Sequence, residues 1–157
     1  MLIQLPPNEA SFLLNLFLCI LFASIIGSER ELRGKPAGIS THSFVIGGSM
    51  IFAFISSIAD PESKTRIAAQ IVSGIGFLGA GIILKNGSGK ISNLTTAASL
   101  WFSASIGMAI GFNYHILATL AALYAVIVAR IPHVGILRKN HHIRIKFKRK
   151  KNGPDRI

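Results

Sequence analysis

The chain has 157 residues, of which 50% are hydrophobic and 15% are charged, and its mean hydropathy is +0.52. Soluble domains carry about 25% charged residues, so this composition excludes an ordinary water-soluble enzyme and predicts a membrane protein. The single cysteine, Cys19, excludes an intramolecular disulfide and a zinc site built from cysteines. The net charge of +11 is concentrated in residues 130–157, which hold ten of the 17 Lys and Arg and one of the six Asp and Glu.

Long uncharged segments separated by charged residues predict the membrane-spanning helices. Such segments are Ala10–Ser28, Ile39–Ala59, Ile67–Leu84 and Ile91–Ala129. A helix needs about 20 apolar residues to cross a bilayer core, so the last segment, with 39 residues, is long enough for two crossings. Gly and Asn in residues 111–115 favour a turn between them. The sequence therefore predicts an all-α bundle of five transmembrane helices over residues 1–131, with spans at about 10–28, 39–59, 67–84, 94–111 and 115–131.

The distribution of Lys and Arg among the loops predicts the orientation of this bundle. An N-terminus outside the cell places 15 Lys and Arg on the cytoplasmic side and two outside, in agreement with the positive-inside rule. We therefore expect the N-terminus outside and the C-terminus in the cytoplasm. The first segment has no basic region before it and no small-residue cleavage motif after it, so we expect it to remain as the first helix.

Residues 132–157 form a short basic cytoplasmic tail in this topology. Apolar and basic residues alternate between Ile143 and Lys148 with the period of two that is typical of a strand. Since one strand does not fold alone, the tail is either the first strand of a further domain or a disordered arm. Cations near an anionic membrane surface contribute about 1 kcal/mol each, so we expect lipid head groups and no nucleic acid as its partner. The candidate lipid-binding residues are Arg144, Lys146, Lys148, Arg149, Lys150 and Lys151.

Small residues recur at helical spacing in the third and fourth spans. Those of the third span are Ala69, Ser73, Gly76 and Ala80, and those of the fourth are Thr96, Ser99, Ser103 and Gly107. In lipid, such faces let two helices approach closely and are stabilised by dispersion and interhelical hydrogen bonds. Each face is either a seam inside the bundle, a contact surface for a second copy or another membrane protein, or a narrow polar path.

The loop after the first span carries two carboxylates, Glu29 and Glu31, each four residues before a cation. Pairs at this spacing stabilise helices, so one interpretation is that the first helix continues past the membrane until Gly34 and Pro36 end it. The alternative is that Glu29 and Glu31 hold a hydrated divalent cation such as Mg²⁺, which prefers oxygen ligands. His42, at the start of the second span, is a candidate proton-carrying or ligand-binding group.

The start of the third span carries Arg66 and Gln70, one helical turn apart. We expect them to pair with Asp60 or Glu62, or to orient groups of a neighbouring helix. No serine or cysteine has a histidine and an orienting carboxylate in a pattern that would build a nucleophile. The sequence therefore predicts no catalytic residues and a protein that is not an enzyme.

Three ordered motifs resemble one family of membrane proteins. They are GSERELRGKPAGISTH over residues 27–42, RIAAQIVSGIGFLGAG over residues 66–81 and LTTAASLW over residues 94–101. Together they resemble the MgtC/SapB family of bacterial inner-membrane proteins, over roughly residues 10–131. The polar residues of these motifs are Glu29, Arg30, Glu31, Lys35, His42, Arg66, Gln70, Thr95 and Thr96.

The resemblance implies a protein that supports growth at low magnesium and survival under acid or intracellular stress in pathogens. It also implies the F-type ATP synthase as a membrane partner that such a protein restrains. Longer members continue into a cytosolic ACT-like domain, of which this chain has at most the first strand, so we expect a short form, whether natural or truncated.

Two functional hypotheses follow from the sequence. The first is a membrane regulator that binds another membrane protein, or itself, through the small-residue faces. The second is a conduit or sensor for Mg²⁺ or protons, in which the ion would be bound in turn by the polar residues Glu29, Glu31, His42 and Asp60. Apart from Mg²⁺, no cofactor is expected.

Overall fold

The computed structural model describes residues 7–63, 65–85 and 91–131, which form five helices and one two-stranded antiparallel ribbon. The elements in chain order are α1 (Pro7–Leu32), α2 (Ile39–Ala59), α3 (Thr65–Ile82), β1 (Leu84–Lys85), β2 (Ile91–Ser92), α4 (Leu94–Gly111) and α5 (His115–Arg130). The predicted five-helix bundle is confirmed. The first four helices are long and apolar enough to cross a membrane, and α5 is a shorter apolar helix of 16 residues.

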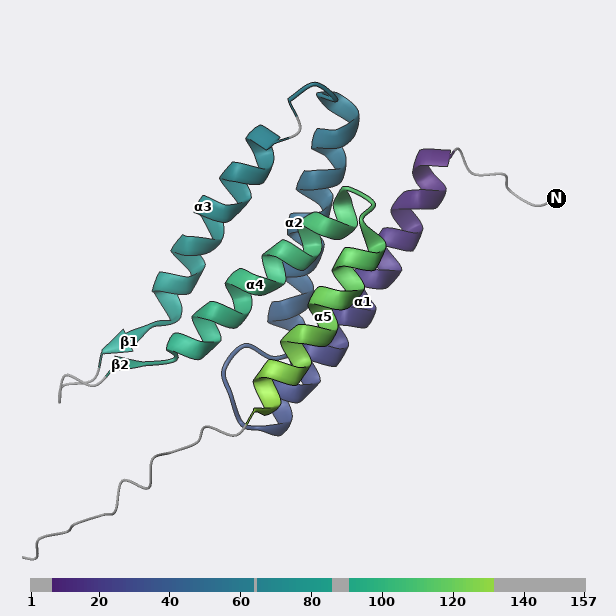
Figure 1. Cartoon of the computed structure of the whole chain (residues 1–157). Helices are drawn as coiled ribbons and strands as arrows, with labels where there is room; N and C mark the ends of the chain where they lie inside the picture. Colours follow the sequence, from purple (N-terminus) through teal and green to yellow (C-terminus); the bar gives the residue numbers. More distant parts are fainter. Residues whose placement is uncertain (1–6, 64, 86–90, 132–157) are drawn as a thin grey trace, which may run out of the picture.

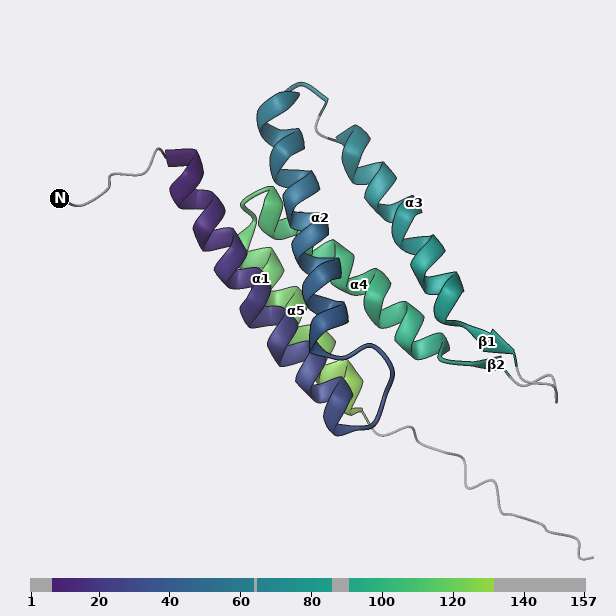
Figure 2. The ribbon, with the colours of Figure 1, turned by 180° about the vertical axis from the view of Figure 1, so that it is seen from behind.

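Successive helices run in opposite directions (Figure 1). The α1–α2 loop, the β1–β2 ribbon and the C-terminal end of α5 therefore lie at one end of the bundle, here called the basic end because it carries Arg30, Arg33 and Lys35. The α2–α3 loop and the α4–α5 turn lie at the opposite end (Figure 1). The reverse view shows α3 at the edge, beside α2 and α4 and away from α1 (Figure 2). Which end faces the cytoplasm stays a prediction.

The first helix continues to Leu32, four residues beyond the predicted span. Gly34 then adopts a φ of +60°, and its N–H donates to the Glu31 carbonyl at 2.9 Å. The Lys35 N–H donates to the Arg30 carbonyl at 3.0 Å. These two bonds form a Schellman motif, in which a residue with positive φ satisfies the last carbonyls of a helix. The interpretation in which α1 extends to a stop at Gly34 is confirmed.

The fourth helix ends with the same motif, formed by a different residue type. Asn113 has a φ of +61° and donates its N–H to the Ile110 carbonyl, while Tyr114 donates to the Ala109 carbonyl, both at 2.8 Å. Asparagine tolerates this left-handed conformation better than other residues with side chains. The predicted turn within residues 111–115 is confirmed, and Asn113 makes it, whereas Gly111 is the last residue of α4.

Two glycines bring the backbones of α2 and α4 into close contact. A methyl group added to Gly107 would collide with the Ile46 carbonyl, and one added to Gly111 would collide with the Met50 carbonyl. The side chains of Ile46 and Met50 are completely buried in the core that surrounds this contact. The glycines therefore allow the α4 backbone to lie directly on α2, and ten of the 18 residues of α4 are buried.

A polar network ties α1 to the α4–α5 turn inside the opposite end of the bundle. The Asn15 amide nitrogen donates to the Asn113 side-chain oxygen at 3.0 Å, and the Asn15 oxygen lies 2.7 Å from Nε2 of His115. Asn15 is fully buried. Because an unpaired amide in lipid is costly, this network fixes how far α1 can slide along its neighbours.

Gly107→Ala should lower the thermal stability of the detergent-solubilised chain. The added methyl group has to displace the Ile46 carbonyl, and overpacking of this kind costs about 1–3 kcal/mol. Circular dichroism melting measures the effect. The matched control is Gly74→Ala in α3, where nothing lies within 4 Å of the added methyl group and the melting temperature should stay unchanged or rise. Equal melting temperatures for the two variants would contradict the assigned α2–α4 contact.

Candidate functional site

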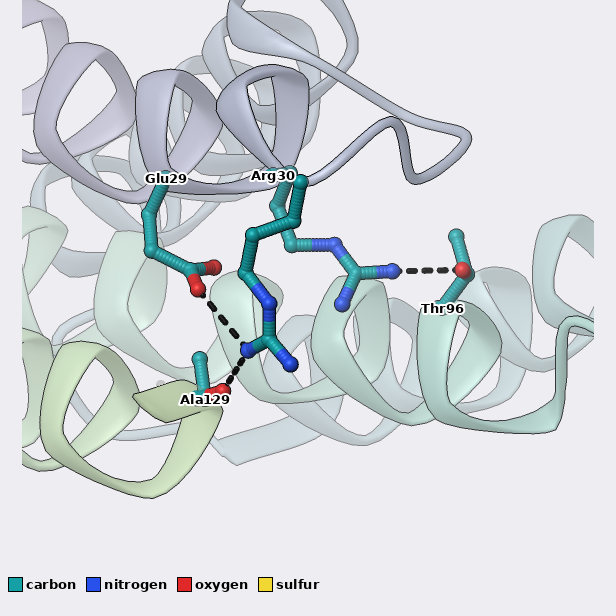
Figure 3. Close-up of polar contacts among 5 residues, drawn as sticks. Glu29, Arg30, Thr96 and Ala129 are labelled. Atoms are coloured by element: carbon teal, nitrogen blue, oxygen red, sulfur yellow. Dashed lines mark hydrogen bonds and ion pairs between the residues drawn. The ribbon is translucent and has the colours of Figure 1, made fainter. Parts of the chain in front are cut away.

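Charged and hydroxyl side chains converge at the basic end, where α1 meets α4 and α5. This polar cluster consists of Glu29 and Arg30 of α1, Arg33 in the turn that follows α1, Thr96 of α4 and the backbone carbonyl of Ala129 in α5 (Figure 3). Glu29 and Arg30 lie on the turn of α1 that the sequence assigned to the membrane surface, yet both are buried. These two side chains therefore belong to the interior of the bundle, whereas Arg33 is exposed at its end.

Arg33 links the end of α1 to the end of α5. Its Nη1 lies 3.0 Å from Oε1 of Glu29, which confirms the predicted pair at four-residue spacing. The same nitrogen donates to the Ala129 carbonyl (Figure 3). Carbonyls in the last turn of a helix lack an intrahelical partner and carry partial negative charge, so a cation is favoured there. Arg33 thus neutralises both Glu29 and the negative end of α5.

Arg30 is a buried cation with no ion pair of its own in the described part of the chain. Its side chain is 4% exposed, and Nη2 donates to the Thr96 hydroxyl at 2.5 Å. Its Nε is buried without a hydrogen-bond partner. A buried charge is stable only when it is paired and hydrogen-bonded, so this guanidinium retains unused capacity to bind an anion.

The small-residue face of α4 is a seam inside the bundle. Thr96 accepts from Arg30, and the Ser103 hydroxyl lies 2.8 Å from Nδ1 of His42, a fully buried residue of α2. Ser99 is half-buried and donates to the Thr96 carbonyl at 2.8 Å. Near the basic end this face supplies hydroxyl groups. Farther along α4, Gly107 lies directly against the backbone of α2. Nε2 of His42 is buried without a partner.

The small-residue face of α3 lies in a different environment. Ala69, Ser73, Gly76 and Ala80 are all exposed on the surface of the single chain. A methyl group added to Gly76 would meet nothing within 4 Å. The faces of α3 and α4 have similar spacings of small residues in the sequence. In the structure α2 covers the face of α4, whereas the face of α3 is exposed.

The two candidate cation ligands have different partners. Glu29 pairs with Arg33, whereas Oε1 of Glu31 accepts the Ile39 N–H at 2.9 Å at the start of α2. The predicted pair between Glu31 and Lys35 is wrong, because the helix ends at Leu32 and the four-residue spacing no longer applies. Within the described residues, no group of three or more His, Cys, Asp or Glu could hold a metal ion. Glu29 and Glu31 thus have different partners, and their role in holding Mg²⁺ stays a prediction.

The polar residues at the start of α3 are not paired as predicted. Arg66 is exposed and makes no ion pair with Asp60 or Glu62, and an Asp60 oxygen accepts the Ser63 N–H at 3.1 Å instead. Gln70 lines an apolar cavity of about 480 Å³ between α2 and α3. Thr95 is exposed at the start of α4. The lipid-binding residues proposed for the tail, Arg144, Lys146, Lys148, Arg149, Lys150 and Lys151, lie outside the described residues.

Three contacts were not predicted from the sequence, two at the basic end and one, that of Asn15, at the opposite end. The Ala129 carbonyl is a backbone group and leaves no mark in the sequence. Asn93 has a φ of +64° and donates its side-chain amide to the Ile82 carbonyl at 3.2 Å, joining α4 to the end of α3. Asn15 offered a signal, because a single amide inside an uncharged segment marks an interhelical hydrogen bond in a membrane bundle.

This arrangement of apolar helices, buried polar contacts and glycine seams defines a multi-pass α-helical membrane protein. The MgtC family model matches residues 16–134, which is most of the chain. The chain therefore belongs to the MgtC family and is a multi-pass protein of the bacterial inner membrane.

Two relatives show how much of a longer protein the chain covers. Protein MgtC of Salmonella typhimurium strain LT2 is 44% identical over 122 residues, which are 76% of this chain and 52% of MgtC. "Putative magnesium transporter YhiD" of Escherichia coli K12 is 37% identical over 148 residues, 87% of this chain and 68% of YhiD. The chain thus spans about half the length of the MgtC proteins that it matches. No solved structure gives a significant match.

Thr96→Val should destabilise the bundle by removing the one hydrogen-bond acceptor that the described residues give the Arg30 side chain. A hydrogen bond to a charged group contributes about 1.5–3 kcal/mol, so a clear drop in melting temperature is expected in detergent. Thr95→Val is the matched control, because Thr95 is the exposed neighbour of Thr96 and makes no such bond. Equal melting temperatures for Thr96→Val and Thr95→Val would show that the Arg30–Thr96 hydrogen bond does not contribute to stability.

Proposed function

We propose that this protein is a non-enzymatic regulator that acts through helix–helix contact with another membrane protein or with a second copy of itself. The contact surface is the small-residue face of α3, formed by Ala69, Ser73, Gly76 and Ala80. The observation that carries the proposal is the incomplete packing of α3. Only Ile75 and Gly79 of its 18 residues are buried, although it carries the kind of face that membrane helices use for close association.

The exposed face of α3 is better suited to contact with a protein partner than to contact with lipid. Lipid-facing positions elsewhere in the bundle carry large side chains, such as Phe17 of α1 and Leu120 of α5, which are about 60% exposed. The α3 face instead offers alanine, serine and glycine, which leave room for a backbone to approach. The Ser73 hydroxyl is satisfied by the Ala69 carbonyl at 3.2 Å, so it adds no unpaired polar group to the face.

The link to magnesium comes from the relatives. The name of YhiD describes a magnesium transporter, and the family resemblance implies growth at low magnesium and resistance to acid or intracellular stress. We propose the same physiological setting for this chain. The F-type ATP synthase is the membrane partner that the resemblance suggests.

Gly76→Leu should abolish partner capture without preventing membrane insertion. The leucine projects from the exposed face of α3 and keeps an approaching helix away, and its Cβ meets no atom of the described chain within 4 Å. Cross-linking in native membranes followed by mass spectrometry identifies the captured protein. Gly81→Leu is the matched control, because Gly81 is also exposed and unobstructed but lies five residues along α3, about 140° around the helix. Unchanged cross-links with Gly76→Leu would remove the proposal.

A conduit or sensor for Mg²⁺ or protons is the second candidate, favoured by the name of YhiD. His42 supports it best, since it is buried between α2 and α4 with an unpartnered Nε2. Glu29 and Glu31 contact different groups, Arg33 and the Ile39 N–H, which argues against one cation-binding position shared by both carboxylates.

Purified protein in liposomes distinguishes the two candidates. A regulator should give no Mg²⁺ or proton flux above that of empty liposomes, because the buried polar residues are held in separate helix contacts. Flux that falls in Glu29→Gln, Glu31→Gln or His42→Gln would instead establish the conduit.

A further inference from the structure

A cavity of about 490 Å³ opens at the basic end between α1, α4 and α5. Three cations line it, Arg30, Arg33 and Lys35, together with hydroxyls of α4 such as those of Thr96 and Ser99. No Asp or Glu is among the described residues that line this basic cavity. A cavity with several cations and hydroxyls and no carboxylate is suited to an anion.

The buried guanidinium of Arg30 is the strongest single indication of a ligand. It is 96% buried and lines the cavity, and its Nε has no partner while Nη2 is bound to Thr96. The nearest carboxylate in sequence, Glu29, is already paired with Arg33. Since a buried cation needs a counter-charge, an anion in the cavity would complete the environment of Arg30.

The start of α4 adds backbone donors to the same cavity. Leu94, Thr95 and Thr96 line it, and their N–H groups precede the first hydrogen bond of the helix, which runs from the Ala97 N–H to the Asn93 carbonyl. Asn93 makes no side-chain cap on α4. Uncapped N–H groups at the positive end of a helix favour a negatively charged ligand.

The chain itself has little negative charge to place in this cavity. Residues 86–90 contain one Lys and no acidic residue, and residues 132–157 contain nine Lys and Arg and one Asp. These two segments therefore carry more positive than negative charge.

The remaining wall of the cavity is apolar. Ile26, Phe102, Tyr124 and Val128 line it, and the rings of Phe102 and Tyr124 lie 5.5 Å apart. Charged groups beside an apolar wall at one end of a membrane bundle match the division between a lipid head group and its acyl chains. We propose that the basic cavity binds the phosphate group of an anionic phospholipid, with an acyl chain along the Phe102–Tyr124 wall. This site is on a different part of the bundle from α3 and does not rest on the proposed regulator.

Native mass spectrometry of the delipidated full chain in detergent tests the proposal with phosphatidylglycerol, phosphatidylcholine and inorganic phosphate. Phosphatidylglycerol should bind in preference to phosphatidylcholine. Lys35→Gln should weaken it about tenfold, as expected for the loss of a charge-assisted hydrogen bond. Arg30 and Arg33 are left intact, because Arg30 is buried and Arg33 is the ion-pair partner of the buried Glu29. The matched control, Arg66→Gln, removes one charge from the exposed start of α3, outside the cavity, and should change binding by less than about twofold.

Tyr124→Ala separates a lipid from free phosphate, because it removes part of the apolar wall and no charge. Weaker phosphatidylglycerol binding in this variant, together with failure of inorganic phosphate to displace the lipid, supports the phospholipid. If inorganic phosphate displaces the lipid, and Tyr124→Ala binds phosphatidylglycerol as well as the unaltered chain does, the phospholipid proposal is overturned in favour of free phosphate. Equal binding of the two lipids, or binding that is lost in Arg66→Gln and kept in Lys35→Gln, overturns the site itself.

Discussion

Direct backbone contact between α2 and α4 is the interaction on which the rest of the bundle depends. In lipid, apolar burial does not drive helices together, so close approach and interhelical hydrogen bonds have to hold them. Gly107 and Gly111 bring α4 onto the carbonyls of α2, and His42 adds a hydrogen-bond contact to Ser103 along the same interface. With α4 fixed in this way, α1 and α5 pack on one side of the pair and α3 stands at its edge (Figure 2). The polar cluster and the basic cavity both form around the start of α4.

The number and order of the helices could be predicted from the sequence, because the absence of charge over long segments is a strong physical requirement of the bilayer. The bounds of α2 and α4 match the predicted spans 39–59 and 94–111, whereas the C-terminal end of α1 lies beyond its predicted span. That end depends on the positive φ of Gly34 and on the carbonyls that Gly34 and Lys35 satisfy. The local rule that paired Glu31 with Lys35 failed for the same reason, since the chain turns between them and Glu31 binds the start of α2.

The small-residue faces show what a sequence pattern leaves open. Spacing identifies residues on one side of a helix, but it does not say which neighbour covers them. The face of α4 is buried against α1 and α2 through Thr96, Ser103 and Gly107, whereas a methyl group on Gly76 of the α3 face would meet no described atom within 4 Å. Contacts such as that of Arg30 with Thr96, 66 residues later in the chain, require the arrangement of the whole bundle.

The buried amide of Asn15 bears on the way the protein is assembled during synthesis. Its partners, Asn113 and His115, follow it by 98 and 100 residues, so the first helix is made well before the groups that satisfy it. Until the last helical hairpin has entered the bilayer, this amide must rely on water or on transient partners. The final depth of the first helix is therefore decided late, after the ribosome has produced nearly all of the membrane domain.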